Sequence, residues 1–262
     1  QMCIRDRAGC RSVVLVPTLV RGVNDDQVGE IIEFAYKHRD VVRCVNFQPV
    51  SITGRIDYSK REQMRITIPD LIHLAEEQTK GRIKADDWYP VPTVVPIARV
   101  AASLVGRGFP EFSCHPHCGM ATYIIPTWRG YKPITAFADI DGLLDALDAA
   151  VGLENKDEMK KVLKDAVKKH VSKSFLIRYF LPILWKGEYE ALRRLHYKMI
   201  MIGSMHFMDP YNFDVDRVQR CIIHYATPDG RIIPFCSYNS IHRPLVERKF
   251  SVPIEKWRPA RA

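Results

Sequence analysis

Residues 12–50, SVVLVPTLVRGVNDDQVGEIIEFAYKHRDVVRCVNFQPV, decide the fold class of this chain. The segment 12–20 is apolar and valine-rich, the pattern of a strand that is buried on both faces. Asn24 then supplies an N-cap for a helix that has acidic residues in its first turn. A second strand follows over 41–51. Strand, helix and strand within about 40 residues predict a βαβ unit, and hence a parallel sheet or barrel.

Polar side chains stand at the carboxyl ends of these two predicted strands. They are Thr18, Asn24, Gln48 and Ser51. Because parallel α/β folds bind their ligands at this edge, we expect a ligand there. Farther along the chain, Thr67 and Asp70 form a capping-box pair that begins another helix.

The proline-rich segment 87–100 predicts an irregular crossing into a second region of the chain. In that region, hydrophobic periodicity predicts strands at 121–128 and 134–140 and helices at 141–151, 155–171 and 188–198. The helix at 155–171 carries apolar residues along one stripe and lysines on the opposite face.

The segment 221–236, CIIHYATPDGRIIPFC, has a cysteine at each end and reads as a tight hairpin. Its residues 228–230, Pro-Asp-Gly, have strong turn chemistry and are flanked by β-branched and aromatic residues. In such a hairpin Ile222 pairs roughly with Cys236. Cys221 and Cys236 then become near neighbours.

A second cysteine pair, Cys114 and Cys118, is spaced so that both sulfurs can lie on one side of a turn. Four thiolates suit tetrahedral zinc or a [4Fe–4S] cluster. Zinc motifs more often contain CxxC, so the CxxxC and CX14C spacings favour iron–sulfur, with zinc and metal-free thiols as the alternatives. His115 and His117 are either ligands, exposed loop residues or donors to a cluster sulfur. Cys44 reads as a core thiol.

Composition and charge restrict the class of protein. The net charge of +9 is concentrated in 154–198, which predicts either a solvated helix face or a surface that attracts anionic groups. No nucleic-acid-binding motif with aromatic platforms is present. No apolar run approaches the roughly 20 residues that span a bilayer, and no signal peptide is evident, so we expect a cytoplasmic protein.

The common catalytic motifs are absent. The chain has no GxSxG, P-loop, HExxH or GxGxxG sequence. His206 reads as a core histidine or as a catalytic residue. The cysteines therefore carry the strongest chemical signal.

Several segments together resemble the radical S-adenosylmethionine superfamily. Residues 14–35 and 45–55, VLVPTLVRGVNDDQVGEIIEFA and VNFQPVSITGR, are similar to the last strands of its barrel. The segments SCHPHC (113–118), HFMDPYNFDVDRVQRC (206–221) and HYATPDGRIIPFCSYN (224–239) resemble the archaeal tetraether lipid synthase group. The hairpin also resembles the auxiliary-cluster segment of the SPASM extension.

This resemblance implies an α/β protein with a partial (β/α) TIM-type barrel, followed by an α+β region that holds an auxiliary iron–sulfur site. It implies S-adenosyl-L-methionine and a [4Fe–4S] cluster as cofactors. The cluster ligands would be Cys114, Cys118, Cys221 and Cys236, and Thr18, Asn24, Gln48 and Ser51 would close the S-adenosylmethionine pocket.

The chain departs from the superfamily in one respect, because the CxxxCxxC triplet of the radical-generating cluster is absent. In the superfamily this triplet follows the first barrel strand. Residues 1–10 resemble a non-native start. We therefore expect an inactive fragment with the distal barrel at 11–86 and the auxiliary region at 87–262.

The expected function is hydrogen abstraction from an unactivated carbon, followed by coupling of lipid hydrocarbon chains. A long apolar substrate, an external electron donor and an anionic membrane surface are the expected partners, with no nucleic acid and with peripheral membrane association. The apolar segments 175–185 and 199–208 would line a lipid channel, and the lysine-rich helix would anchor headgroups. The alternatives are a SPASM-type enzyme that modifies a peptide or cofactor, and a zinc-stabilised binding module without redox activity.

Overall fold

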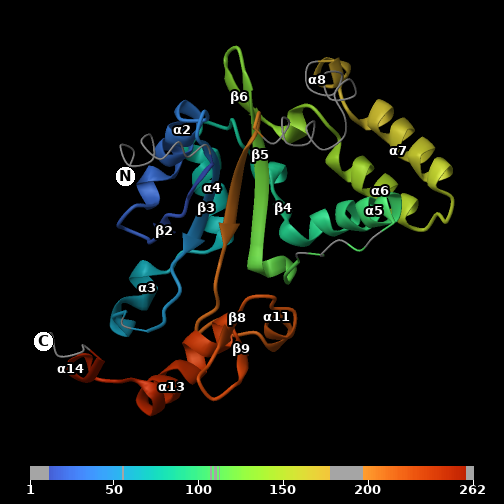
Figure 1. Ribbon diagram of the computed structural model, residues 1–262. Coiled ribbons are helices and arrows are strands. Elements are labelled where there is room, and N and C mark those ends of the chain that lie inside the picture. Colours follow the sequence, from blue (N-terminus) through green and yellow to red (C-terminus); the bar gives the residue numbers. More distant parts are fainter. Residues whose placement is uncertain are drawn as a thin grey trace, which may run out of the picture.

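A mixed β-sheet runs through the centre of the molecule (Figure 1). The computed structural model describes residues 12–54, 56–106, 108, 111, 113–177 and 197–257. The strands of the sheet are β1 (Val13–Leu15), β2 (Thr18–Leu19), β3 (Val42–Pro49), β4 (Tyr89–Pro90), β5 (Gly119–Thr127), β6 (Gly130–Pro133) and β7 (Ile200–Met205). Their order is β1-β3-β7-β5-β4, with β2 paired to β3 and β6 to β5. Strands β1, β2, β3 and β7 run parallel, whereas β4, β5 and β6 are antiparallel additions.

Helices surround this sheet and continue into a carboxyl-terminal group below it (Figure 1). The α-helices are α2 (Val28–Lys37), α3 (Arg61–Met64), α4 (Ile68–Gln78), α5 (Val95–Val105), α6 (Ile140–Val151), α7 (Lys156–His170), α8 (Lys173–Phe175), α11 (Val215–Gln219), α12 (Phe235–Ser237), α13 (Arg243–Phe250) and α14 (Ile254–Trp257). Short 3-10 helices span Asp25–Gln27, Tyr58–Lys60, Ala85–Asp87, Val91–Val94, Pro116–Cys118 and Ile134–Ala136, and a π-helix spans Tyr238–His242. The hairpin consists of β8 (His224–Ala226) and β9 (Ile232–Pro234).

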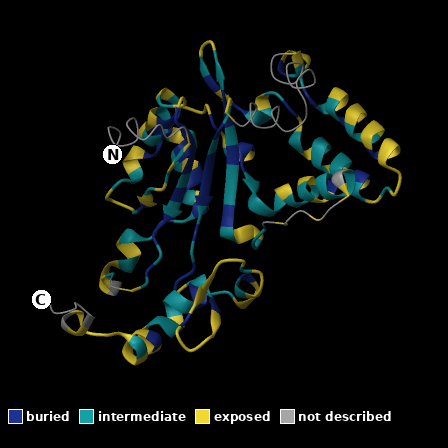
Figure 2. Cartoon of the chain, viewed as in Figure 1, coloured by how far each residue is buried: buried dark blue, intermediate teal, exposed yellow. Residues whose placement is uncertain are grey.

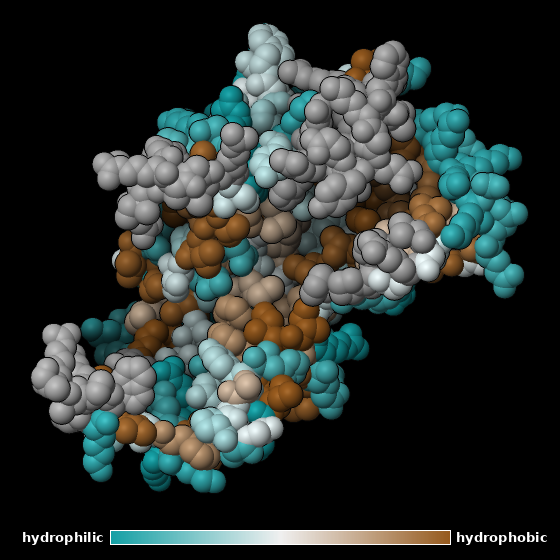
Figure 3. Space-filling model, viewed as in Figure 1, coloured by the Kyte–Doolittle hydropathy of each residue, from teal (hydrophilic) through white to brown (hydrophobic). Residues whose placement is uncertain are grey.

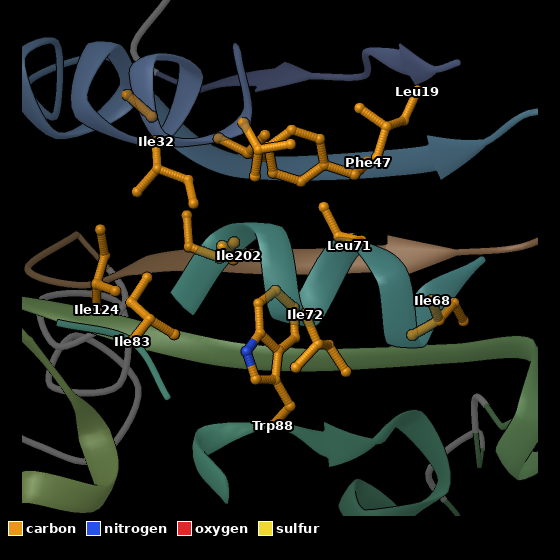
Figure 4. Close-up of a cluster of buried hydrophobic side chains, with 14 of the residues drawn as sticks. Leu19, Ile32, Phe47, Ile68, Leu71, Ile72, Ile83, Trp88, Ile124 and Ile202 are labelled. Atoms are coloured by element: carbon orange, nitrogen blue, oxygen red, sulfur yellow. The ribbon is translucent and has the colours of Figure 1, made fainter. Parts of the chain in front are cut away.

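The main core lies between the sheet and helices α2 and α4 (Figure 4). Phe47 from β3 and Ile202 from β7 are fully buried there against Leu71 of α4. The most deeply buried parts of the chain are accordingly the central strands (Figure 2). Burying such side chains contributes about 1.5–3 kcal/mol each, so this core fixes the positions of the strand ends.

The predicted βαβ unit is confirmed by β1, α2 and β3, which pair β1 with β3 in parallel. The prediction that 12–20 is buried on both faces is wrong. Val14 and Val16 are 51% and 52% exposed, while Leu15 packs against the core. Successive side chains of a strand point to opposite faces, and the described helices cover only the face that Leu15 shares. Valine content shows that a strand forms but not which of its faces becomes covered.

Two other predictions in the second region are wrong. Segment 134–140 is not a strand, because the strand ends at Pro133 and Ile134–Ala136 forms a 3-10 helix. Ile134, Phe137 and Ile140 are three residues apart, a spacing that presents one helical face to a small core. Segment 87–100 is not irregular throughout, since α5 begins at Val95 with proline in its first turn. Proline is well tolerated there because the first helical N–H has no partner.

The remaining predicted elements are largely confirmed. Segment 121–128 lies mostly in β5, and 141–151 and 155–171 correspond to α6 and α7. The predicted helix 188–198 lies mainly outside the described residues, and its last two residues, 197 and 198, form a turn. The partial barrel remains a prediction, since the described strands form a mixed, open sheet.

The capping box of α4 leads to a stability prediction. Thr67 accepts a hydrogen bond from the Asp70 backbone N–H, and the Asp70 carboxylate accepts one from the Thr67 N–H at 2.9 Å. Replacing Thr67 with alanine should lower the free energy of unfolding by about 1 kcal/mol, measured by urea denaturation. His73→Ala, at an exposed position of the same helix, should change it by less than about 0.5 kcal/mol. Equal losses in the two variants would contradict the capping role.

Candidate metal centre and sheet edge

The carboxyl ends of β3 and β7 meet at one edge of the sheet because the two strands are parallel. The chain segments that leave these strands are tied to each other. Ser51 donates its hydroxyl hydrogen to the Met208 carbonyl at 3.1 Å, and the Ile52 N–H donates to the Asp209 carboxylate at 2.9 Å. The backbone around 206–209 is therefore held against the end of β3.

Cys114 and Cys118 reach this edge from β5. That strand is antiparallel to β7, so its first residue, Gly119, pairs with Met205 at the end of β7. Cys118 directly precedes Gly119, and its carbonyl accepts a hydrogen bond from His206 N–H at 2.9 Å. The turn Pro116–Cys118 thus places the CxxxC pair beside the chain that leaves β7.

Cys221 and Cys236 reach the same place from the carboxyl-terminal group. The hairpin pairs His224 with Pro234, which is the register predicted from the sequence. The Cys236 sulfur accepts a hydrogen bond from Met208 N–H at 3.3 Å, and the Cys221 thiol donates to the Ile223 carbonyl at 3.1 Å. Met208 therefore links Ser51, after the end of β3, to the hairpin cysteine Cys236.

A cavity of about 220 Å³ lies between these segments. All four predicted ligands, Cys114, Cys118, Cys221 and Cys236, line it. Apolar neighbours that include Val91, Ile222 and Phe235 close it, and hydrophobic side chains gather at the surface between the sheet and the carboxyl-terminal group (Figure 3). His115 and His117 do not line the cavity; their rings pack on each other in the preceding turn. The two cysteine pairs are about a hundred residues apart in the sequence but line the same cavity in the fold.

The cavity is larger than a single ion requires. A zinc ion holds its sulfurs at about 2.3 Å, so any two of them lie less than about 4.6 Å apart. Among the described residues, no three cysteine, histidine, aspartate or glutamate side chains are close enough to hold one metal ion. The cavity is several times larger than the share of one water molecule, which is about 30 Å³. The choice between an iron–sulfur cluster, zinc and metal-free thiols stays a prediction.

The protonation of the cysteines is uneven. The Cys114 thiol donates a hydrogen bond to the Cys118 sulfur, which lowers the pKa of Cys118 and raises that of Cys114. Arg217 lowers the pKa of Cys118 further. Burial raises the pKa of Cys236. Within the Cys114–Cys118 pair, the ionised form is therefore favoured at Cys118.

Two further polar residues line the cavity. Arg217 is buried and donates its Nε–H to the Cys118 sulfur at 3.4 Å. His206 is also buried, and its Nε2 has no hydrogen-bond partner in the described part of the chain. Burial, with Arg217 and Arg65 nearby, lowers the pKa of His206 to about 4, which keeps the imidazole neutral at pH 7. A buried ring nitrogen without a partner costs free energy unless a bound group satisfies it.

Some of the residues predicted to contact S-adenosylmethionine already make hydrogen bonds within the protein. Thr18 and Gln48 are ladder partners. Asn24, predicted as a helix cap, makes no capping bond; it accepts from Val20 N–H and donates to the Thr18 carbonyl, both at 2.9 Å. The predicted side-chain cap is therefore wrong, because the Asn24 amide fastens the loop after β2 instead. The contacts to S-adenosylmethionine stay a prediction. Ser51 is likewise engaged with Met208.

The face of the sheet opposite α2 and α4 carries amide side chains. Val45 and Phe47 face the helices, so Asn46 and Gln48 face the other way. Neither amide makes a side-chain hydrogen bond within the described part of the chain, and both are partly exposed. Asn46 lies in one row with Gly203 and Ala121, and its amide oxygen lies over the Gly203 backbone.

Sequence reasoning missed Arg217, Arg65 and Asp209. Asp209 is fully buried and accepts hydrogen bonds from Ile52 N–H, from Tyr211 N–H and from Arg65 at 2.7 Å. Charged residues are usually exposed, so their identity alone did not single them out. The only available signal was the place of Asp209 and Arg217 in the segment 206–221, which carried the family resemblance; Arg65 had none.

The surface features predicted for a membrane have ordinary structural roles. No helix among the described residues is long and apolar enough to cross a membrane. Segment 199–208 contains β7, where Ile200 and Ile202 are buried in the core. The lysines of α7 lie on its solvent face, and two of them pair with aspartates one turn away. Segment 175–185 lies mostly outside the described residues.

The chain matches no protein-family profile. It is 50% identical over 267 aligned positions to a 7,8-dihydro-6-hydroxymethylpterin dimethyltransferase of Methanocaldococcus jannaschii. The match covers 96% of this chain and 53% of that protein, so the chain spans about half the length of the curated relative. The similarity to an enzyme over nearly the whole chain bears out the prediction of an enzyme.

The same similarity overturns the predicted reaction. The relative is named for a pterin substrate and for methyl transfer, not for the coupling of lipid chains. Assignment to the tetraether lipid synthase group is therefore wrong, as are the lipid substrate and the anionic membrane surface as partners. The cysteine site stays a prediction, and motifs shared among related enzymes did not discriminate their substrates.

Proposed function

We propose that this chain forms part of a radical S-adenosylmethionine enzyme that methylates a pterin, and that its four converging cysteines hold a [4Fe–4S] cluster. The observation that carries this proposal is the single cavity that the four cysteines line. The similarity to a pterin dimethyltransferase supports the substrate and the reaction. The superfamily motifs at 14–35 and 45–55 support the cofactor.

The residues around the cavity fit a sulfur-ligated cluster. Four thiolates are the donor set that such clusters use. The wall contains a buried cation, Arg217, and an unpartnered histidine nitrogen, and both favour an occupant that carries negative charge and hydrogen-bond acceptors. A bound cluster would supply one-electron redox chemistry at this edge of the sheet. Met208 and the Cys118 backbone hold the ligands in place through the hydrogen bonds described above.

The sheet edge carries candidate contacts for the other two components. Thr18 and Gln48 remain candidates for contacts to S-adenosylmethionine, because Asn24 and Ser51 are engaged elsewhere. Asn46 is the candidate for pterin recognition. Its amide offers both a donor and an acceptor, which match the polar edge of a pterin ring, and its ladder neighbours Gly203 and Ala121 are small.

Metal content tests the cluster. Protein purified without oxygen should be brown, absorb near 400 nm and contain about four irons per chain. A colourless protein, or one that contains a single zinc ion, would refute the proposed cluster.

Asn46→Ala tests the pterin site. We expect this variant to bind 7,8-dihydro-6-hydroxymethylpterin roughly 2- to 10-fold more weakly, the usual effect of losing one hydrogen bond. Binding is measured by fluorescence titration without oxygen. Gln27→Ala, an exposed amide on the helix-covered side of the sheet, should bind as the unchanged protein does. Equal affinity in both variants would remove Asn46 from the site.

A further inference from the structure

Arg217 is placed at the cavity by a local feature of the sequence. Asp214 is the N-cap of α11, and its carboxylate accepts hydrogen bonds from the N–H groups of Asp216 and Arg217. The cap begins the short helix so that Arg217 turns inward, where it is only 7% exposed. Arg220, three residues later in the same turn region, is exposed.

The guanidinium of Arg217 makes two contacts that join the strand end to the cysteines. Its Nη2 donates to the His206 carbonyl at 2.7 Å, and its Nε donates to the Cys118 sulfur at 3.4 Å. In the described part of the chain no carboxylate forms an ion pair with it. The Asp214 carboxylate is engaged by backbone N–H groups instead.

A buried cation without a carboxylate needs another source of negative charge, because isolated burial of an arginine costs several kcal/mol. The cysteine sulfurs supply that charge. The Cys118 sulfur lies 3.4 Å from the Arg217 Nε, and Cys114, Cys221 and Cys236 line the same cavity. A four-thiolate [4Fe–4S] cluster is anionic, and it becomes more negative when it gains an electron. The charge that Arg217 compensates is therefore largest in the reduced cluster.

We infer that Arg217 is a positioning residue that sets the reduction potential of the cluster, and this inference rests on the proposed cluster. When one electron from an external low-potential donor enters the cluster, no bond breaks and the cluster gains one negative charge. The fixed guanidinium stabilises the reduced cluster. The hydrogen bond from its Nε–H to Cys118 also withdraws charge from the ligand sulfur. Hydrogen bonds to cluster sulfurs and net charge are among the factors that set such potentials. Arg217 therefore raises the potential.

The test is an EPR-monitored redox titration of the whole chain, with dithionite as the reductant. Arg217→Met removes the charge and both N–H donors. It should make reduction at least about tenfold less favourable, which corresponds to 59 mV for a one-electron couple. Arg217→Lys keeps the charge but lacks the planar set of N–H donors. Its reduction potential should lie between those of Arg217→Met and the unchanged protein. The matched control is Arg220→Met, which removes an exposed charge from the same turn and should leave the potential unchanged.

The outcomes separate this inference from the proposed cluster. If the unchanged protein takes up iron and Arg217→Met keeps the same potential, the inference is overturned while the cluster stands. If the unchanged protein holds no cluster, both fail. Should Arg217→Met not retain iron, Arg217→Lys decides the matter. A lowered potential in the lysine variant supports the role of the donor geometry, and an unchanged potential contradicts it.

Discussion

Replacing Cys236 with alanine is expected to abolish the iron content of the chain. Cys236 is buried at the cavity wall, and its sulfur is fixed by the Met208 N–H. Its removal takes away one of the four ligands that the proposed cluster uses. Iron and acid-labile sulfide, measured after reconstitution without oxygen, should fall from about four irons per chain to near zero. Cys221→Ala should behave in the same way.

Cys44→Ala provides the matched control, because it also removes a buried cysteine. Cys44 lies in β3, and burial raises the pKa of its thiol to about 11, so it is not a thiolate near neutral pH. Its replacement should leave the iron content unchanged. Metal binding is coupled to folding, so the Cys236 variant should also lose stability in the hairpin region. Full iron content in the Cys236 and Cys221 variants would show that the ligands are assigned wrongly.

The sequence predicted the parts of the fold that local patterns control. The βαβ unit of 12–50 follows from hydrophobic runs and their lengths, and the hairpin register follows from a turn that allows only one close pairing. The Thr67 cap follows from a pattern three residues long. Each of these depends on residues near one another in the chain, which is why a single sequence suffices.

The parts that failed depend on distant residues. The exposure of Val14 depends on which elements cover its face, and nothing in its own strand encodes that. The Asp214 cap turns Arg217 inward, but the sulfur that its guanidinium contacts lies about a hundred residues earlier in the chain, and no local pattern encodes that contact. The candidate ligands were identified because cysteine types and spacings are rare, whereas ordinary charged residues in the same site gave no local signal.

The lipid substrate was inferred from the family resemblance, and the segments assigned to bind it have simpler explanations. An apolar run such as 199–208 is required of any strand in the middle of a sheet, and β7 lies between β3 and β5. Lysines opposite an apolar stripe are required of an amphipathic helix such as α7, which buries Met159 on its other side. The contact proposed for the pterin is a single amide, that of Asn46, which composition cannot single out.

Asp209→Ala should produce the largest loss of stability of any single polar change at this edge. The carboxylate is completely buried and joins three separate segments, through the N–H groups of Ile52 and Tyr211 and the guanidinium of Arg65. Removing it leaves two backbone donors and the partly buried Arg65 guanidinium without their carboxylate partner. Breaking a buried pair in this way costs about 3–5 kcal/mol, which urea denaturation measures directly.

The control for Asp209 is Glu62→Ala, which removes a carboxylate that is 86% exposed and paired with Arg61 at 3.6 Å. Surface pairs contribute about 0–1 kcal/mol, so this variant should unfold almost as the unchanged protein does. Arg65→Met should cost less than Asp209→Ala, because Arg65 is partly exposed and its loss leaves the two backbone bonds intact. Asp209 directly follows Met208, whose N–H holds the Cys236 sulfur in place. The Asp209 variant should therefore also take up less iron. Normal stability together with normal iron uptake would show that the strand ends do not depend on this carboxylate.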